Sequence, residues 1–135
     1  MRIKRMLIPA AVLAVLIMVV PVFAGCGKVA GYSDPVTENI LVSMNRGDYA
    51  GFSKDFDATM KSELPEETFP AFLTQVNGQI GNYIADSKKI TGVEVANGLT
   101  TATYKADFEA MEGVTVEVVY KEIDGQMKVV GLWFR

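Results

Sequence analysis

Two residue types that dominate enzyme active sites are nearly missing from this sequence. Its 135 residues contain no histidine and a single cysteine. A Ser/His or Cys/His couple cannot form, because the imidazole base is absent. Zinc would lack its usual nitrogen and sulfur ligands, and the close acidic pairs have neither the spacing nor the glycine of a calcium loop. We expect no catalytic residue, no bound metal and no cofactor.

Positive charge is also scarce once the N-terminal segment is set aside. Arg2, Lys4 and Arg5 come first, and the rest of the chain holds ten basic against 16 acidic residues, a net charge of −6. Proteins that bind nucleic acid or anionic lipid by charge concentrate lysine and arginine on one surface. Nucleic acid is therefore not an expected partner.

The chain begins with a segment that has the parts of an export signal. The three basic residues precede an uncharged run of 19 residues, and small residues follow just before the cysteine. Phe23-Ala24-Gly25-Cys26 resembles a lipobox, the recognition site of prokaryotic lipoprotein signal peptidase, with Phe23 in place of the usual leucine. We predict a lipoprotein-type signal peptide over residues 1–25.

The same resemblance assigns a role to the only cysteine. Cys26 would become the mature N-terminus and carry two acyl chains, which hold a protein to a membrane where one chain anchors it only marginally. Two alternatives stay open: the apolar run is just long enough to span a bilayer as a retained anchor, or the leader is cleaved without lipidation. All three place the body outside the cytoplasm, and lipidation places it on the extracytoplasmic side of the cell membrane.

Helical spacing begins after a short tether over residues 26–33. Asp34-Pro35 predicts the start of a first helix, which Gly47 ends, and Asp48 predicts the N-cap of a second. A third helix follows with Pro70 in its first turn. The apolar positions expected to face the core are Val36, Ile40, Leu41, Met44, Tyr49, Phe52, Phe56, Met60, Phe69, Phe72, Leu73, Val76 and Ile80.

From Tyr83 onward the apolar pattern alternates, which is typical of strands. A four-stranded antiparallel meander is therefore expected after the helices. The predicted strands cover residues 83–95 (bent near Gly92), 99–108, 114–120 and 127–134, with hairpin turns at Asn97-Gly98 and Asp124-Gly125.

The final predicted strand is apolar on both faces. Met127, Val129 and Trp133 lie on one face, and Val130, Leu132 and Phe134 on the other. Two apolar faces are typical of a central strand, and also of a strand with one face on the core and the other against a partner. Both interpretations stay open.

Helices first and a curved meander second is the order of the nuclear transport factor 2-like cone fold. Within that superfamily the chain resembles the domain-of-unknown-function family numbered 3887. The segments that carry the resemblance are Asn45-Arg46-Gly47-Asp48-Tyr49, Phe56-Asp57, Met60-Lys61 and Val130-Gly131-Leu132-Trp133-Phe134. It implies an α+β fold, one cone-like domain over residues 34–135 with N-terminal helices packed on a curved antiparallel sheet, and it brings no activity.

The cone fold implies a pocket between the helices and the concave face of the sheet. The candidate lining residues are Tyr49, Phe52, Phe72, Tyr104, Phe108, Tyr120 and Trp133. Large aromatic side chains can also fill such a cavity, so an open and a closed pocket are both compatible with the sequence. Relatives such as ketosteroid isomerase use a tyrosine and carboxylates there. Tyr104 and Asp107, however, are three apart on one strand and should point to opposite faces.

These observations favour a membrane-tethered extracytoplasmic binding or interaction module without catalytic activity. Its partner would be an unknown envelope protein, a small apolar ligand, or a second copy paired through the exposed sheet face. The alternative is an isomerase- or hydratase-like cone-fold enzyme acting on a small apolar substrate. A tyrosine and an aspartate converging inside one open cavity would favour the enzyme.

Overall fold

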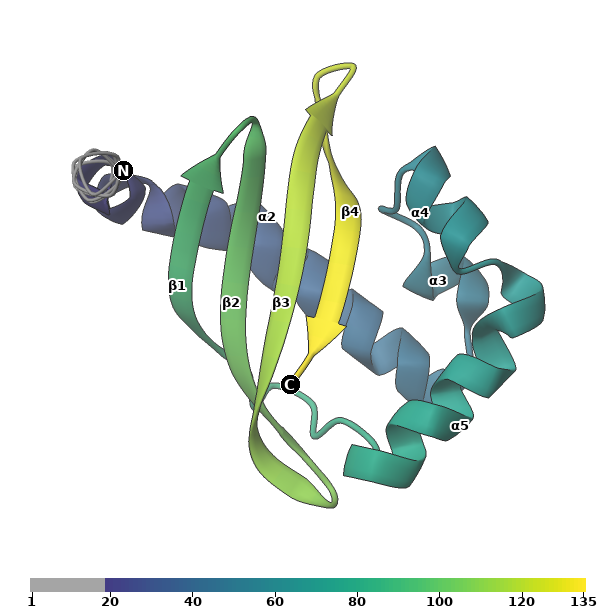
Figure 1. Cartoon of the computed structure of the whole chain (residues 1–135). Helices are drawn as coiled ribbons and strands as arrows, with labels where there is room; N and C mark the ends of the chain where they lie inside the picture. Colours follow the sequence, from purple (N-terminus) through teal and green to yellow (C-terminus); the bar gives the residue numbers. More distant parts are fainter. Residues whose placement is uncertain (1–18) are drawn as a thin grey trace, which may run out of the picture.

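The computed structural model describes the backbone of residues 19–135 and the side chains from Gly27 onward. Within this part of the chain, helices come first and a four-stranded antiparallel sheet follows, which confirms the predicted α+β class (Figure 1). The elements are α2 (Val19–Arg46), α3 (Tyr49–Phe52), α4 (Ala58–Glu63), a 3-10 turn η1 (Glu66–Thr68), α5 (Phe69–Ile80), β1 (Lys89–Ala96), β2 (Leu99–Phe108), β3 (Met111–Ile123) and β4 (Gln126–Phe134). The predicted leader up to residue 18 and the side chain of Cys26 lie outside the described residues.

Helix α2 begins much earlier than the predicted start at Asp34-Pro35. Pro35 lies inside the helix. A proline there leaves the carbonyl four residues earlier without its amide donor. That carbonyl belongs to Gly31, which is exposed, so water can take the place of the missing amide. The segment predicted as a tether is therefore helical, and its Val29 and Ser33 are buried in the domain.

The C-terminal end of α2 agrees with the sequence. Gly47 follows the last helical residue with a φ of 66°, a conformation that glycine adopts without strain. Asp48 then caps α3, because its side chain accepts a hydrogen bond from the Gly51 amide at 3.1 Å. A side chain at position 51 would meet the oxygens of Asp48 and Ser43, so this junction requires glycine.

The predicted second helix is broken into α3 and α4. Between them, Asp57 donates its amide to the Val129 carbonyl at 3.0 Å, and Val129 donates to the Asp55 carbonyl at 2.7 Å. Asp57 then caps α4 by accepting from the Met60 amide at 2.8 Å. The break satisfies the backbone on the outer edge of β4, which an unbroken helix would leave unpaired.

Helix α5 begins near the predicted position, with Pro70 in its first turn. Gly81, at a φ of 81°, ends it, whereas the other glycine predicted to mark this end, Gly78, lies within the helix. Residues 83–88 are not part of β1, which begins at Lys89, and their one β-bridge joins Tyr83 to Phe108. Ile84 and Ser87 also form hydrogen bonds with Asp107 of β2.

The sheet order is β1-β2-β3-β4, with every neighbouring pair antiparallel. Both predicted hairpin turns are confirmed. Asn97 and Gly98 have φ angles of 55° and 78°, and Asp124 and Gly125 have 54° and 79°, as a two-residue turn with two left-handed positions requires. On β2, the alternate residues Ala102, Tyr104, Ala106 and Phe108 are all buried.

Strand β4 differs from its prediction in two ways. It is an edge strand, so the central position is wrong. A bulge opposite Val119 and Tyr120 also adds one residue, which places Val129 and Leu132 on the core side although they are three apart. Trp133 therefore lies on the opposite face from Val129, with its side chain 51 % exposed over Gly131.

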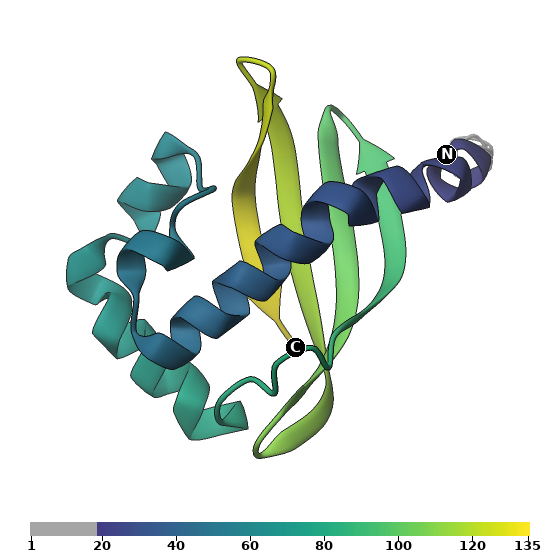
Figure 2. The ribbon, with the colours of Figure 1, turned by 180° about the vertical axis from the view of Figure 1, so that it is seen from behind.

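The two faces of the sheet have different surroundings. Figure 2 shows α2 lying diagonally across one face, with α3, α4 and α5 beyond the β4 side. The other face, seen in front in Figure 1, is not covered by any helix of the described residues. The hydrophobic core lies between α2 and the covered face and continues under the short helices.

Candidate functional site

Six of the seven predicted pocket residues pack into or against the core. Phe52, Tyr104 and Tyr120 are fully buried, Phe108 is nearly so, and Tyr49 and Phe72 are partly buried against the same cluster. The structure does not bring Trp133 to them, because that side chain lies on the uncovered face of the sheet.

Aromatic packing fills the region between the short helices and the sheet. The Phe52 ring lies 4.6 Å from that of Phe69, 5.0 Å from that of Phe56 and 5.8 Å from that of Phe72, measured between ring centroids. Such distances are those of rings in direct contact. The predicted pocket is therefore occupied by its own aromatic side chains.

A polar cluster joins α2 to the centre of the sheet. The hydroxyls of Tyr104 and Tyr120 both lie 2.9 Å from Ser33 Oγ, and Tyr104 donates to Asp34 Oδ1 at 2.6 Å. Ser33 Oγ also lies 3.5 Å from the Thr37 hydroxyl. Every member has a partner, so the cluster fixes the position of α2 on the sheet without leaving a buried polar atom unsatisfied.

Burial sets the ionisation of these tyrosines. It raises the pKa of Tyr120 to about 12, against hydrogen bonds from Ser33 and Thr37 that lower it. Burial also raises the pKa of Tyr104, and the hydrogen bond to Asp34 raises it further because a phenolate cannot donate. Both hydroxyls are held in the neutral form that donates hydrogen bonds.

One turn further along α2, Glu38 ties the loop before β1 to the helix. Its Oε1 accepts from the Tyr83 hydroxyl at 2.7 Å and from Lys88 Nζ at 3.1 Å, and its Oε2 accepts from the Asp86 amide at 3.0 Å. Burial alone would raise the pKa of Glu38, but these donors together hold it below its usual value. Asn45 holds the same loop, pairing with both backbone groups of Tyr83.

The predicted separation of Tyr104 from Asp107 is confirmed. Asp107 accepts a hydrogen bond from the Gly113 amide at 3.0 Å, away from the buried Tyr104 hydroxyl. A tyrosine and an aspartate do meet, but the aspartate is Asp34 of α2. Since Tyr104 is fully buried and its hydroxyl already has two partners, the observed role of this pair is to position the helix.

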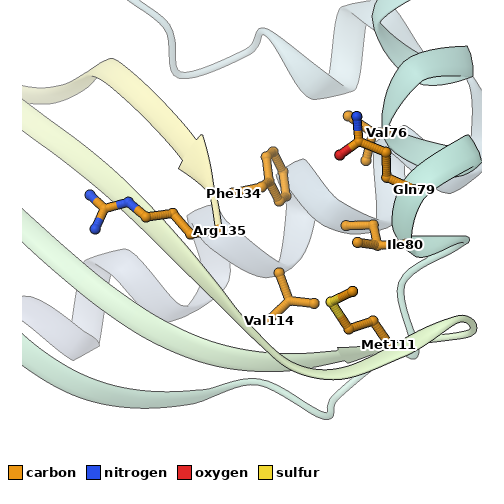
Figure 3. A pocket seen from close by; sticks show the side chains of 7 residues that line it. All are labelled: Val76, Gln79, Ile80, Met111, Val114, Phe134 and Arg135. Atoms are coloured by element: carbon orange, nitrogen blue, oxygen red, sulfur yellow. The ribbon is translucent and has the colours of Figure 1, made fainter.

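A cavity of about 170 Å³ lies elsewhere, between the C-terminal half of α5 and the end of the sheet where β2 turns into β3 (Figure 3). Its lining residues are Val76, Gln79, Ile80, Met111, Val114, Phe134 and Arg135. None of them was predicted as a site residue. The spacing of Val76 and Ile80 predicted only that they lie on the core side of a helix. Nothing in the sequence indicates that Met111 of the β2–β3 hairpin faces α5.

Charge in this cavity is already compensated. The Arg135 guanidinium forms an ion pair with Glu117, and Figure 3 shows its side chain pointing away from the other lining residues. Gln79 is the remaining polar side chain of the lining. The arrangement can hold an uncharged apolar group and offer it one amide.

Two further properties concern only the part of the chain that the structure describes. No group of three or more Cys, Asp or Glu side chains there is arranged to hold a metal ion. None of its helices combines the length and hydropathy needed to cross a membrane.

Comparison with known proteins gives a family and a fold neighbour. Residues 37–132 match the family model described as "Protein of unknown function (DUF3887)". No curated protein matches the chain. Among solved structures, a designed NTF2-like protein, Rd1NTF2_05 carrying several substitutions, is similar at 14 % identity and a TM-score of 0.49, over 80 % of this chain and 99 % of that one.

Proposed function

Because the chain belongs to the DUF3887 family, whose description names no activity, we propose a function from its own site and leader. The protein is a binding module without catalytic activity, tethered by lipid on Cys26 at the extracytoplasmic side of the membrane. Its ligand is a small, uncharged, apolar molecule, and its ligand site is the cavity between α5 and the β2–β3 hairpin.

The cavity is the observation that supports ligand binding. The cavity is open to solvent on one side, where Gln79, Met111 and Arg135 are exposed, and its volume of about 170 Å³ is close to the roughly 150 Å³ of an engineered, enclosed apolar cavity that takes up benzene. A single ring or a short branched chain therefore fits. A charged ligand is disfavoured, because no unpaired ionic group lines the cavity to replace the lost hydration.

The lining also favours binding over the enzyme alternative. It contains no carboxylate and no tyrosine, the groups that an isomerase or hydratase of this fold class would need for proton transfer. The Tyr104–Asp34 pair that has the right chemistry is closed off within the contact between α2 and the sheet.

Ligand binding is tested by methyl NMR of the domain with benzene and indole as probes. We expect saturable shifts confined to the methyl groups of Val76, Ile80, Met111 and Val114. Val76→Phe adds a ring inside the cavity and should abolish these shifts. Gln75→Phe adds the same ring to the exposed side of α5 and should leave them unchanged.

Two outcomes would contradict ligand binding in the cavity. One is shifts scattered over the surface that never saturate. The other is binding that survives Val76→Phe, since the ring would then occupy the volume assigned to the ligand.

The tether is tested separately by mass spectrometry of the membrane fraction. The N-terminal peptide should begin at a Cys26 that carries two acyl chains, and Cys26→Ala should release or mislocalise the protein. An intact Met1 on the membrane-bound form would instead show a retained anchor.

A further inference from the structure

Only one of the three hairpin tips of the sheet is free of charge. The β1–β2 tip runs from Val95 through Asn97-Gly98 to Thr103 without an ionisable residue. Its Val95 and Leu99 are 45 % and 37 % exposed, on opposite faces of the hairpin. The other two tips, residues 107–112 and 121–128, carry acidic or basic side chains.

Helix α2 passes this same end of the sheet on its way out of the domain. The Tyr32 ring packs edge-on against Tyr120 at 5.1 Å, and Tyr120 pairs with Thr100, the neighbour of Leu99. Figures 1 and 2 agree that the N-terminal end of α2 extends beyond the β1 side of the sheet. The chain therefore leaves the domain beside the uncharged tip.

The helix leaves little distance between the predicted lipid site and the domain. Cys26 lies in α2, three residues before the buried Val29. At about 1.5 Å per helical residue, this places the backbone of Cys26 roughly 5 Å along the helix from Val29. A lipid at this position would hold the domain directly on the bilayer instead of on a flexible linker.

We propose that the β1–β2 hairpin tip inserts its apolar side chains into the interface of the bilayer that anchors the protein. This inference rests on the lipid anchor of the proposed function. The tip itself brings no ionic group into the interface, and Lys121, the cross-strand partner of Leu99 on β3, can keep its amine at the headgroups through its long side chain. The chain after the leader has a net charge of −6, so anionic lipids would not attract it and the contact depends on apolar side chains. Neutral phosphatidylcholine is therefore a sufficient surface.

Labelling of the full lipidated chain tests the contact. The sulfur of Cys26 is acylated in that form, so Leu99→Cys introduces the only free thiol, which is coupled to an environment-sensitive fluorophore. Glu112→Cys is the matched control, because Glu112 is exposed on the β2–β3 hairpin at the other end of the sheet and does not line the cavity. Both proteins are reconstituted in phosphatidylcholine vesicles that contain spin-labelled lipid.

The expected result is loss of fluorescence for the label at position 99 and none for the label at position 112. Equal signals at the two positions in vesicle-bound, acylated protein would overturn the docking and leave the anchor intact. Protein that does not float with the vesicles and has an unmodified Cys26 would overturn both.

Discussion

The buried side of α2 has two halves that contact the same sheet in different ways. The C-terminal half presents Ile40, Leu41 and Met44, which belong to the hydrophobic core. The N-terminal half, in which Val29 also reaches the core, presents Ser33 and Thr37, which are equally buried but meet the sheet through hydroxyl groups. One helix therefore combines a contact based on apolar packing with a contact based on hydrogen bonds.

The two contacts stabilise the fold to different degrees. Complete burial of an aliphatic side chain contributes about 1.5–3 kcal/mol, while a hydrogen bond in a folded protein contributes about 1 kcal/mol net. Hydrogen bonds require their partners in defined positions, because an unpaired buried hydroxyl destabilises the protein. The apolar half should contribute more stability, and the hydroxyl half should define where the helix lies.

The largest effect is expected in the apolar half. Leu41→Ala removes a fully buried side chain and should lower the free energy of unfolding by about 2–5 kcal/mol. Urea denaturation followed by circular dichroism measures the loss. Val42→Ala, at a partly buried neighbouring position, is the control and should cost less. Equal losses would mean that α2 does not pack on the sheet along the described stripe.

In the hydroxyl half, Tyr104→Phe should lower the free energy of unfolding by about 1–3 kcal/mol. The substitution keeps the ring but deprives Asp34 Oδ1 and Ser33 Oγ of their shared partner. A double-mutant cycle with Ser33→Ala should give a coupling energy clearly different from zero. Additive effects would show that the two hydroxyls do not act together.

Alkaline pH should weaken the hydroxyl half selectively. The pKa of Tyr120 is about 12 in the folded protein and about 10 in an unfolded chain, so the folded state binds the proton more tightly. Its contribution is complete below pH 10 and is lost as the pH rises toward 12, at up to about 1.4 kcal/mol per pH unit. Urea denaturation at pH 9, 10 and 11 measures the slope. Tyr120→Phe should make it shallower, and an unchanged slope would contradict the assignment.

Trp133 lies outside both halves of the contact between α2 and the sheet and serves as the reference position. No helix of the described residues covers its face of the sheet. Trp133→Thr should change the free energy of unfolding of a monomer by no more than about 0.5 kcal/mol. The predicted pairing of two copies through this face gives a different result. The loss would then grow with protein concentration, and light scattering would show a dimer that the substitution dissociates.

Much of the fold was predictable because its signals are local. The alternation of β2 and β3, the two hairpin turns and the cap at Asp48 depend on neighbouring residues, and the structure has them where the sequence predicts. The family was also recognisable from its short segments, and the family model covers residues 37–132. The end of α2 at Gly47 is likewise predicted by a local signal, a glycine just after the helix.

The tertiary structure alone decided the rest. Ser33 and Thr37 of α2 are buried hydroxyl residues that give no hydrophobic signal in the sequence, and their role becomes visible only beside Tyr104 and Tyr120. The break before α4 and the bulge in β4 depend on hydrogen bonds between segments far apart in the chain.

The candidate site also separates what the sequence predicts from what only the tertiary structure decides. The sequence indicated which aromatic side chains lie between the helices and the sheet, but not whether they leave a cavity there. A cavity forms where packing is incomplete, and here that place is the junction of α5 with the β2–β3 hairpin. Residue types fix which side chains avoid water, whereas the volume left between them depends on how whole elements meet.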